Sequence, residues 1–365
     1  MPVGADLGSG TAEPMRIWAW QADQSGCGYY RIAEPLRALR DYGGHRIGIQ
    51  PQVRGWVEFK VMGNVAGPAE LCVVQRVVSL DQTPAVRRLR KPGSKLIYEI
   101  DDDMFAIDPR NRAAFALYSK PATLEGLRTA AGLCDLVTVS TEPLATVMAR
   151  ETDRPVAVLP NCITDAMFDV ERSRWDRVRV GWAGGQGHDS DMRSVAGQIK
   201  RFLRRNPQVD FHVIGYDYRR LLGGERVYFS TWQTPIETYW RSIDFDIGIA
   251  PLAHNVFNRS KSALKAMEYG ALGIPCVASD VAPYRDVIVD GVTGFLIMHE
   301  HHWEQRLAEL ANDADLRASM GAAAKAHVRR FALSRNWRAW EATYARLLGK
   351  AHDRPEAAPA LVYPP

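Results

Sequence analysis

Two cations and a carboxylate recur at helical spacing in the segment 245–280. Lys261, Lys265 and Glu268 stand at positions i, i+4 and i+7, so on a helix they form one polar stripe. Small polar groups precede them, and Ser262 is the expected N-cap of the helix. Free amides, the positive end of the helix dipole and lysine charge together bind anions. The stripe therefore predicts a phosphate-binding site, although a solvated Lys–Glu pair on an amphipathic helix would give the same pattern.

Apolar runs flank this stripe. Those at 247–250 and 275–278 are short and end in turn residues, as parallel strands covered on both faces do. Leu264, Met267 and Ala271 form a second, apolar stripe on the helix between them. The apolar stripe would face the core, which turns the polar stripe toward a cleft.

Two further loops combine glycine with the step from a strand to a helix. One follows the first expected strand and contains Gly26 and Gly28, and the other follows the strand at 178–182 and contains Gly184 and Gly185. Glycine lets the backbone approach a ligand, and the next helix points free amides at it. Tight turns also use glycine for backbone reasons alone, so each loop is only a candidate phosphate site.

Apolar runs and helical patterns alternate along the whole chain. This alternation predicts an α/β fold with parallel sheets and helices on both faces. At 365 residues the chain is long for one core and suits two domains. We expect strands at 16–20, 46–51, 71–75, 95–100, 136–140, 178–182, 210–214, 227–229, 247–250 and 275–278, and a turn and strand at 290–297. We expect helices at 29–41, 81–90, 112–131, 143–150 and 190–205, a helix from about 262, and a helical pattern over 303–348, while residues 156–160 close the N-terminal domain.

The composition is that of an ordinary globular protein, with 46% hydrophobic and 24% charged residues. No apolar run approaches the roughly 20 residues that span a bilayer, and residues 1–14 lack the features of a signal peptide. Five scattered cysteines favour reduced thiols and a cytoplasmic location. A net charge of +4 with local arginine clusters permits a nucleic-acid partner, but solvated helix faces look the same.

Several motifs carry a resemblance to a known family. The order DIGIAPL, SKSALKAMEYGALGIPCVASD and DGVTGFLI (290–297) is similar to the C-terminal half of retaining glycosyltransferases of the GT-B fold, family 4-like. VLPNCITDAMF at 158–168 resembles the entry to their second domain, with Cys162 in place of glycine. GCGYYRIAEPLRAL, from Gly26 on, resembles their first strand-to-helix loop. The resemblance implies two doubly wound, Rossmann-like parallel-sheet domains that face a central cleft.

The resemblance also suggests domain bounds. We expect a disordered extension at 1–14, an N-terminal domain on the acceptor side at 15–159, a C-terminal domain on the donor side at 160–332, a helix at 333–350, and a flexible, proline-rich tail at 351–365. In the family the last helix crosses back onto the first domain, and Trp337 and Trp340 are the expected contacts.

A Glu-x7-Glu motif handles the donor in this family. Glu268 matches its second Glu and would hold the ribose hydroxyls of a nucleotide sugar, while the amides of Ser262 and Ala263 would hold the diphosphate. Ser260 stands where the first Glu is expected. This departure leaves the choice of donor sugar unpredicted.

The family's glycine loop usually supplies an Arg and a Lys to the diphosphate, and this chain has neither. Gly184 and Gly185 would still approach the diphosphate, and His188 could donate to it, although a His at a helix start often caps or packs. Lys261 and Lys265 would then carry the positive charge.

The nucleobase would lie at the loops that follow the strands 210–214 and 227–229. Tyr216 or Trp232 could stack on it, and either residue is equally suited to a core.

On the first domain, the resemblance places Gly26, Gly28, Tyr30 and Arg31 at the cleft. Arg31 is a candidate contact to the diphosphate or the acceptor. A packed Tyr30 and a surface Arg31 would fit the sequence as well.

Asp101, Asp102 and Asp103 follow the expected strand Lys95–Ile100, at the sheet edge where α/β folds bind ligands. One interpretation is structural, with an Asp capping the next turn. A second is a metal site, because D-x-D resembles the motif that holds Mn²⁺ or Mg²⁺ in glycosyltransferases of the GT-A fold. The third is a site for the transferred sugar or the acceptor, where GT-B enzymes carry His-Asp. The resemblance to GT-B favours the third, with Asp103 beside the acceptor and no metal.

The resemblance implies transfer of a sugar from a nucleoside diphosphate sugar, first of all a UDP-sugar, to a hydroxyl acceptor with retention of configuration. Lys261, Glu268, Asp101 and Asp102 are the expected catalytic residues, and no cofactor is expected. The acceptor could be a glycan, a lipid or a modified DNA base. The alternatives are a phage-type enzyme acting on hydroxymethylated DNA bases, and a non-catalytic nucleotide-sugar-binding protein on a decayed GT-B scaffold.

Overall fold

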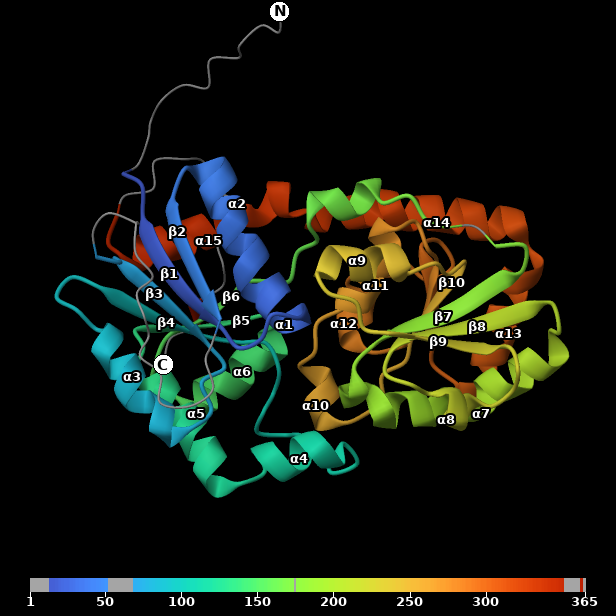
Figure 1. Cartoon of the computed structure of the whole chain (residues 1–365), viewed down its shortest axis with the longest axis horizontal. Coiled ribbons are helices and arrows are strands. Elements are labelled where there is room, and N and C mark those ends of the chain that lie inside the picture. The colour runs from blue at the N-terminus through green and yellow to red at the C-terminus, as the bar shows by residue number, and fades with distance from the viewer. Residues whose placement is uncertain (1–12, 52–67, 174, 351–361, 364–365) are drawn as a thin grey trace, which may run out of the picture.

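Two sheets form the framework of the chain (Figure 1). The computed structural model describes residues 13–51, 68–173, 175–350 and 362–363. The first sheet has the strand order β13-β6-β5-β4-β3-β1-β2, in which all neighbours are parallel except β13 and β6. Its strands are β1 (Arg16–Gln21), β2 (Arg46–Pro51), β3 (Leu71–Gln75), β4 (Lys95–Ile100), β5 (Leu136–Val139), β6 (Val156–Val158) and β13 (Val362–Tyr363).

The second sheet is fully parallel, with the order β12-β11-β10-β7-β8-β9. Its strands are β7 (Val178–Gly184), β8 (Val209–Gly215), β9 (Val227–Thr231), β10 (Ile247–Ala250), β11 (Cys276–Ser279) and β12 (Gly294–Ile297). Counted from β7, this is the classic Rossmann order 3-2-1-4-5-6. The expected doubly wound α/β architecture with two parallel sheets is confirmed.

Helices cover both faces of each sheet (Figure 1). The first domain contains α1 (Gly26–Gly28), α2 (Glu34–Gly43), α3 (Thr83–Leu89), α4 (Arg112–Tyr118), α5 (Pro121–Gly132) and α6 (Glu142–Glu151). The second contains α7 (Asp189–Arg205), α8 (Arg219–Leu222), α9 (Ile236–Ser242), α10 (Val256–Arg259), α11 (Leu264–Ala271), α12 (Ala282–Arg285), α13 (Glu300–Asn312) and α14 (Ala314–Val328), followed by α15 (Leu333–Leu347).

The strands are buried on both faces because their apolar runs are continuous. On β1, Ile17 and Ala19 join one core cluster, whereas Trp18 and Trp20 join the cluster on the opposite face. All four side chains are at most 3% exposed. This two-residue alternation between two hydrophobic layers is what a parallel sheet between helices requires.

Each sheet reverses its strand order once, and these reversals determine where a ligand can bind. The reversal lies between β1 and β3 in the first sheet and between β7 and β10 in the second. Loops leaving neighbouring strands diverge at such a point, so a crevice opens at the carboxyl ends of the strands. The loops after β1, β3, β7 and β10 are therefore the ones to inspect.

The last long helix belongs to the core of the first domain. In Figure 1 the red helices run along one edge of the molecule, with α14 beside the second sheet and α15 beside the first. Trp337 and Trp340 of α15 are buried with Leu36 and Leu39 of α2. The rings of Trp337 and Tyr42 are 6.0 Å apart. The two tryptophans make the contact that the sequence predicted, while the exact domain bounds at 159/160 and 332/333 stay predictions.

Several local expectations were wrong. Ser262 is not the N-cap, because α11 begins at Leu264 with Ala263 as its cap. The expected helix at 112–131 is two helices, α4 and α5, because Pro121 disfavours helical geometry at Lys120. The short helix α10 within the polar loop was not predicted.

The chain ends also differ in part from expectation. Val362–Tyr363 pair with Val156 and Ala157 as an antiparallel edge strand, so the proposed tail at 351–365 includes a paired segment. Residues 1–12, the remainder of that tail and Arg174 lie outside the described residues.

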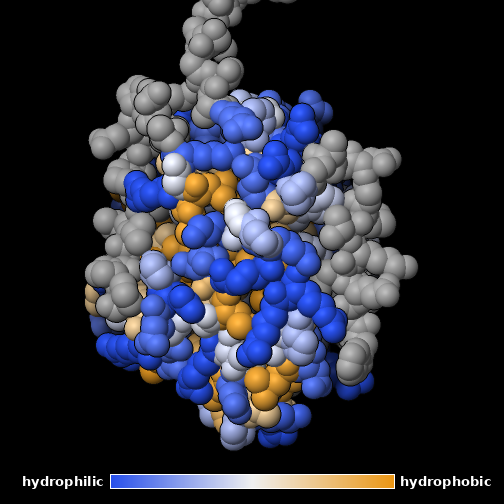
Figure 2. Space-filling model, turned by 90° about the vertical axis from the view of Figure 1, so that its left-hand side faces the viewer, coloured by the Kyte–Doolittle hydropathy of each residue, from blue (hydrophilic) through white to orange (hydrophobic). Residues whose placement is uncertain are grey.

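The side of the molecule formed by the first domain is mainly hydrophilic, with small separate hydrophobic patches (Figure 2). None of the helices in the described ranges is both long enough and apolar enough to span a bilayer.

Candidate active site

A cavity of about 630 Å³ lies between the two domains, at the loops that the strand order singles out. This volume is within the usual range for small-molecule sites. The first domain contributes Ser25, Gly26, Cys27, Tyr30, Arg31, Arg76, Asp101, Asp102, Met104, Ile107, Asn111, Ala114, Tyr118 and Asn161. The second contributes residues 183–188, Gly215, Tyr216, Trp232, Tyr239, Leu252, Phe257, Lys261, Ser262, Leu264, Lys265, Glu268 and Tyr284.

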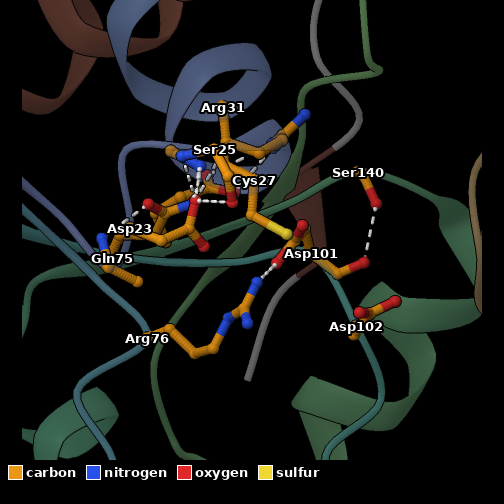
Figure 3. Close-up of polar contacts among 12 residues, drawn as sticks. Asp23, Ser25, Cys27, Arg31, Gln75, Arg76, Asp101, Asp102 and Ser140 are labelled. Carbon is orange, nitrogen blue, oxygen red and sulfur yellow. Dashed lines mark hydrogen bonds and ion pairs between the residues drawn. The ribbon is translucent and has the colours of Figure 1, made fainter. Parts of the chain in front are cut away.

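The loop after β1 is held by hydrogen bonds before any ligand arrives. Asp23 accepts from the amide and hydroxyl of Ser25 and from the amide of Gly28. Gln75, at the end of β3, accepts from the amide of Ala22 and donates to the carbonyl of Cys27. Figure 3 shows these groups around the loop, with the Cys27 side chain directed toward Asp101. The first domain therefore presents a preorganised wall.

Asp101 has a cationic partner that the sequence did not indicate. Nη2 of Arg76 donates to Oδ1 of Asp101 at 2.9 Å (Figure 3). Burial raises the pKa of Asp101, but the Arg76 charge and a hydrogen bond from Cys27 outweigh it and lower that pKa. Burial and the neighbouring Asp101 raise the pKa of Cys27. Asp101 is thus a carboxylate and Cys27 a neutral thiol at neutral pH.

Asp102 makes an ion pair across the cleft. Its Oδ1 lies 3.0 Å from Nζ of Lys261, which comes from the loop before α11 in the second domain. Burial alone would lower the pKa of Lys261, but Asp102 raises it overall. Lys261 also lies over the Phe257 ring, 4.4 Å from its centroid.

The ion pairs bear on the metal alternative for the carboxylates. Asp101 and Asp102 each pair with a cationic side chain, which competes with a metal ion for the same oxygens. Within the part of the chain that the structure describes, no group of three or more His, Cys, Asp or Glu side chains has a metal-binding arrangement. The roles of Asp101 and Asp102 toward the sugar or the acceptor stay predictions.

In the second domain, a chain of hydrogen bonds holds Lys265. Its Nζ lies 3.0 Å from Nε2 of His188, and Nδ1 of His188 lies 2.8 Å from Oδ2 of Asp191. Asp191 is buried, and its other oxygen accepts from the Ala253 amide and the Asn258 side chain. Asp191 therefore fixes the ring of His188, and His188 fixes the ammonium group of Lys265.

The pKa values of this chain follow from its burial. Burial, together with the positive charge of Lys265, lowers the pKa of His188 to about 4. The imidazole is neutral at pH 7, so Nδ1–H donates to Asp191 and Nε2 accepts from Lys265. Burial also lowers the pKa of Lys265 to about 8, with Lys261 adding to the effect and Glu268 opposing it. Lys265 remains mostly charged at neutral pH.

Glu268 is buried, and each of its carboxylate oxygens accepts a hydrogen bond from a tyrosine hydroxyl group. Tyr30 of the first domain donates to Oε1 at 2.6 Å, and Tyr239 of α9 donates to Oε2 at 3.3 Å. Trp240 donates from its indole nitrogen to the Tyr30 hydroxyl at 3.1 Å. Burial raises the pKa of Glu268, and the tyrosine hydrogen bonds and Lys265 oppose that rise. Tyr30, which follows α1 of the first domain, thus reaches Glu268 on α11 of the second domain.

Comparison with known proteins agrees with this geometry. Residues 178–313 match the family model described as glycosyl transferases group 1. Sucrose-phosphate synthase from Thermosynechococcus elongatus has a similar structure, with a TM-score of 0.63 over 92% of this chain and 99% of that chain, at 13% identity. The chain has the GT-B fold, and its residues 178–313 are similar to the group 1 glycosyltransferases.

Two other relatives extend the comparison. Anabaena HepE, solved in complex with UDP-glucose, gives a TM-score of 0.60 over 91% of this chain and 100% of that chain, at 13% identity. A D-inositol 3-phosphate glycosyltransferase from Thermobispora bispora is 36% identical over 104 residues, which are 28% of this chain. The match spans 22% of the length of that curated relative.

Most of the predicted donor residues of this GT-B chain line one cavity. Gly184, Gly185, His188, Lys261, Ser262, Lys265 and Glu268 lie together, with Tyr216 and Trp232 nearby. Trp232 already stacks on Tyr239, with ring centroids 4.2 Å apart. The ring of Tyr216 packs edge-on against Tyr218. Tyr216 and Trp232 stay predictions as nucleobase contacts.

Four predicted residues are set back from the cavity. Gly28 is buried where a Cβ atom would lie 1.8 Å from the Asp23 carbonyl oxygen, so the turn explains its glycine. Asp103 is buried and accepts from the Phe105 amide, as the structural interpretation expects. Ser260 and Ala263 are buried as well. The carbonyl of Ser260 accepts from the Thr141 hydroxyl across the cleft.

Arg31 borders the cavity, but most of the donors of its guanidinium group are engaged elsewhere. It forms a bidentate ion pair with Glu99, through contacts of 2.7 and 3.2 Å, and donates to Asn161 and to the Leu159 carbonyl. Its side chain is 0% exposed. The expected contact of Arg31 to a diphosphate or acceptor conflicts with this geometry, because four of its five N–H donors are already hydrogen-bonded and the side chain is buried.

Proposed function

We propose that this chain transfers a sugar from a nucleoside diphosphate sugar to a hydroxyl acceptor, with retention of configuration. The observation that carries the proposal is the placement of Lys261 and Lys265 beside the Gly184–Gly185 turn, on a domain similar to the group 1 glycosyltransferases. A UDP-sugar is the first candidate, because HepE was solved with UDP-glucose.

The chemical demand of this reaction is charge stabilisation. As the bond between the sugar and the diphosphate breaks, negative charge develops on the leaving group and positive charge on the sugar ring. Lys265, held by His188, and Lys261 would stabilise the leaving group. The bond to the acceptor oxygen forms on the same face, and the acceptor proton passes to a diphosphate oxygen. The remaining task of the protein is to hold both substrates in line.

Donor binding is the first test of the proposal. A thermal-shift series with UDP-, GDP-, ADP- and dTDP-sugars should show stabilisation by one nucleotide class, of about 2.7 kcal/mol at 100 times the dissociation constant. Release of the free nucleotide on incubation would then show turnover. No shift with any of these sugars would contradict the proposal. A thermal shift without any product, even with water as the acceptor, would instead support a non-catalytic binding protein. That alternative stays open because Ser260 stands where the family has its first Glu.

Tyr30 should compete with the donor for Glu268. If Glu268 holds the ribose, the donor must displace the Tyr30 hydroxyl, and a hydrogen bond to a charged group contributes about 1.5–3 kcal/mol. Tyr30→Phe should therefore tighten donor binding about tenfold, whereas Glu268→Ala should weaken it by at least about tenfold. Calorimetric titration with the donor checks both variants. Weaker binding by Tyr30→Phe would mean that Tyr30 supports the donor site.

The DNA-modifying alternative has no support here. The arginine clusters that suggested it lie away from the cavity, and several members form exposed ion pairs, such as Arg90 with Asp135 and Arg205 with Glu304. The five cysteines are free thiols, in keeping with the proposed cytoplasmic location.

A further inference from the structure

The half of the cavity against the first domain contains one cation for each carboxylate. Arg76 pairs with Asp101, and Lys261 pairs with Asp102. The charge of Arg31 is taken by Glu99. An incoming acceptor therefore meets no surplus positive charge on this wall.

This balance disfavours an anionic acceptor. A phosphate group would have to break an existing ion pair to reach a cation, which leaves a carboxylate unpaired in a largely buried site. If Lys261 turned to the donor diphosphate instead, Asp102 would remain and repel a second anion. Either arrangement rejects phosphorylated acceptors by charge.

Unused hydrogen-bonding capacity on this wall suits hydroxyl groups. The side chains of Arg76 and Asp101 are 15% and 12% exposed, so part of this pair is open to the cavity, although Nε of Arg76 itself is buried. The Asp101 carboxylate beside it accepts only. In Figure 3 the guanidinium group of Arg76 and the Asp101 carboxylate face each other beside Cys27. A hydroxyl group can donate to Asp101 while a second one accepts from Arg76.

The backbone of Arg76 shows that this placement is imposed by the fold. Arg76 has a φ angle of 48°, in the left-handed region that favours glycine. Its amide nevertheless donates to the Glu99 carbonyl at 2.9 Å, which locks the turn after β3. Such conformations persist only where the surroundings over-determine them, and they cluster at binding sites.

Apolar side chains also line this half of the cavity, beside the polar Ser25, Asn111 and Asn161. Met104, Ile107, Ala114 and Tyr118 line it from the first domain, and Phe257 lines it from the second. A ligand that fits must combine a hydroxylated edge with an apolar face.

We propose that the acceptor is an uncharged, polyhydroxylated ring, that is, a neutral carbohydrate, with adjacent hydroxyls on the Asp101–Arg76 pair and its apolar face on Met104 and Tyr118. The reacting hydroxyl lies at Asp102, where the ion pair with Lys261 joins the acceptor wall to the donor side. This inference rests on the proposed sugar transfer and narrows its acceptor.

A matched pair of acceptors tests the inference. With the donor that the thermal shifts identify, transfer to a neutral methyl glycoside should exceed transfer to its 6-phosphate by at least about tenfold in kcat/KM. Asp101→Asn removes one negative charge beside Arg76 and should shift this ratio toward the phosphate by about tenfold. Asp41→Asn is the control, because it makes the same charge change at the exposed Asp41–Arg40 pair outside the cavity.

The outcomes separate this inference from the proposed function. A wild-type preference for the phosphorylated acceptor would overturn the inference while leaving sugar transfer intact, and that comparison requires no variant to fold. If the donor is hydrolysed but neither glycoside is glycosylated, saturation-transfer NMR with the UDP-bound protein measures acceptor binding directly. Absence of binding by neutral glycosides would also overturn the inference. Absence of any donor binding would remove the proposed function itself.

Discussion

Replacement of Lys265 by Met is expected to lower kcat for sugar transfer by about 10²–10³-fold, the loss typical of removing one preorganised group that stabilises developing negative charge. The expectation rests on the position of the ammonium group, which is held by His188 at the wall of the cavity. Lys200→Met, which removes an exposed lysine of α7, is the matched control and should leave kcat unchanged. Steady-state kinetics at saturating donor measures the effect.

The pH dependence gives this prediction a second readout. Five titratable groups surround the Lys265 ammonium group. Glu268 and Lys261 lie on its own segment, and Asp102 lies across the cleft. His188, on the glycine loop, and Asp191, on α7, complete the set. Because its pKa is lowered to about 8, its charge is present below pH 8 and is lost as the pH rises through that value. The value of kcat/KM, which reports on the free enzyme, should then fall by up to about tenfold per pH unit above pH 8.

Lys265→Arg separates the charge from the titration. Arginine stays protonated throughout this range, so the alkaline fall in kcat/KM should disappear even if the absolute rate is lower. An unchanged alkaline limb in this variant would show that another group titrates. An unchanged kcat in Lys265→Met would show that Lys261 and the helix amides suffice for the diphosphate.

The fold could be predicted because its signals are local. Buried parallel strands are continuous apolar runs that end in turn residues, and each expected strand was found within a few residues of its position. The stripe of Lys261, Lys265 and Glu268 was readable for the same reason, since the three residues share one helical segment. Its orientation toward the cleft followed from the apolar stripe on the other face.

The partners of these residues were not predictable, because they come from distant segments. Tyr30 and Tyr239 reach Glu268 from 238 and 29 residues away. The family resemblance placed Tyr30 at the cleft, but nothing in the sequence indicated that either hydroxyl group donates to Glu268. Arg76 follows an ordinary strand, and its unusual φ angle has no sequence signal. Asp191 is the exception. It stands three residues after His188, and this spacing could have indicated a hydrogen-bonded pair at the helix start.

Arg31 shows how burial can turn an expected ligand contact into a structural ion pair. The family resemblance placed Arg31 at the cleft, and its residue type suited a diphosphate. The structure instead pairs it with Glu99 beneath the cavity wall, where both side chains are at most 3% exposed. Thr138 also donates to Glu99, so the acid is tied to two neighbouring elements. The pair joins the helical segment after α1 to β4 and β5.

Arg31→Ala is therefore expected to lower the free energy of unfolding by about 3–5 kcal/mol, because it leaves the Glu99 carboxylate buried without its cation. Urea denaturation followed by circular dichroism measures the change. Arg37→Ala is the control, since its pair with Glu34 is half exposed and should contribute at most about 0.5 kcal/mol. The double variant Arg31→Met/Glu99→Leu should recover part of the loss, because it removes both charges together. If Arg31→Ala instead kept full stability and weakened donor binding, the guanidinium group would turn into the cleft in solution, and the diphosphate role suggested by the family resemblance would be restored.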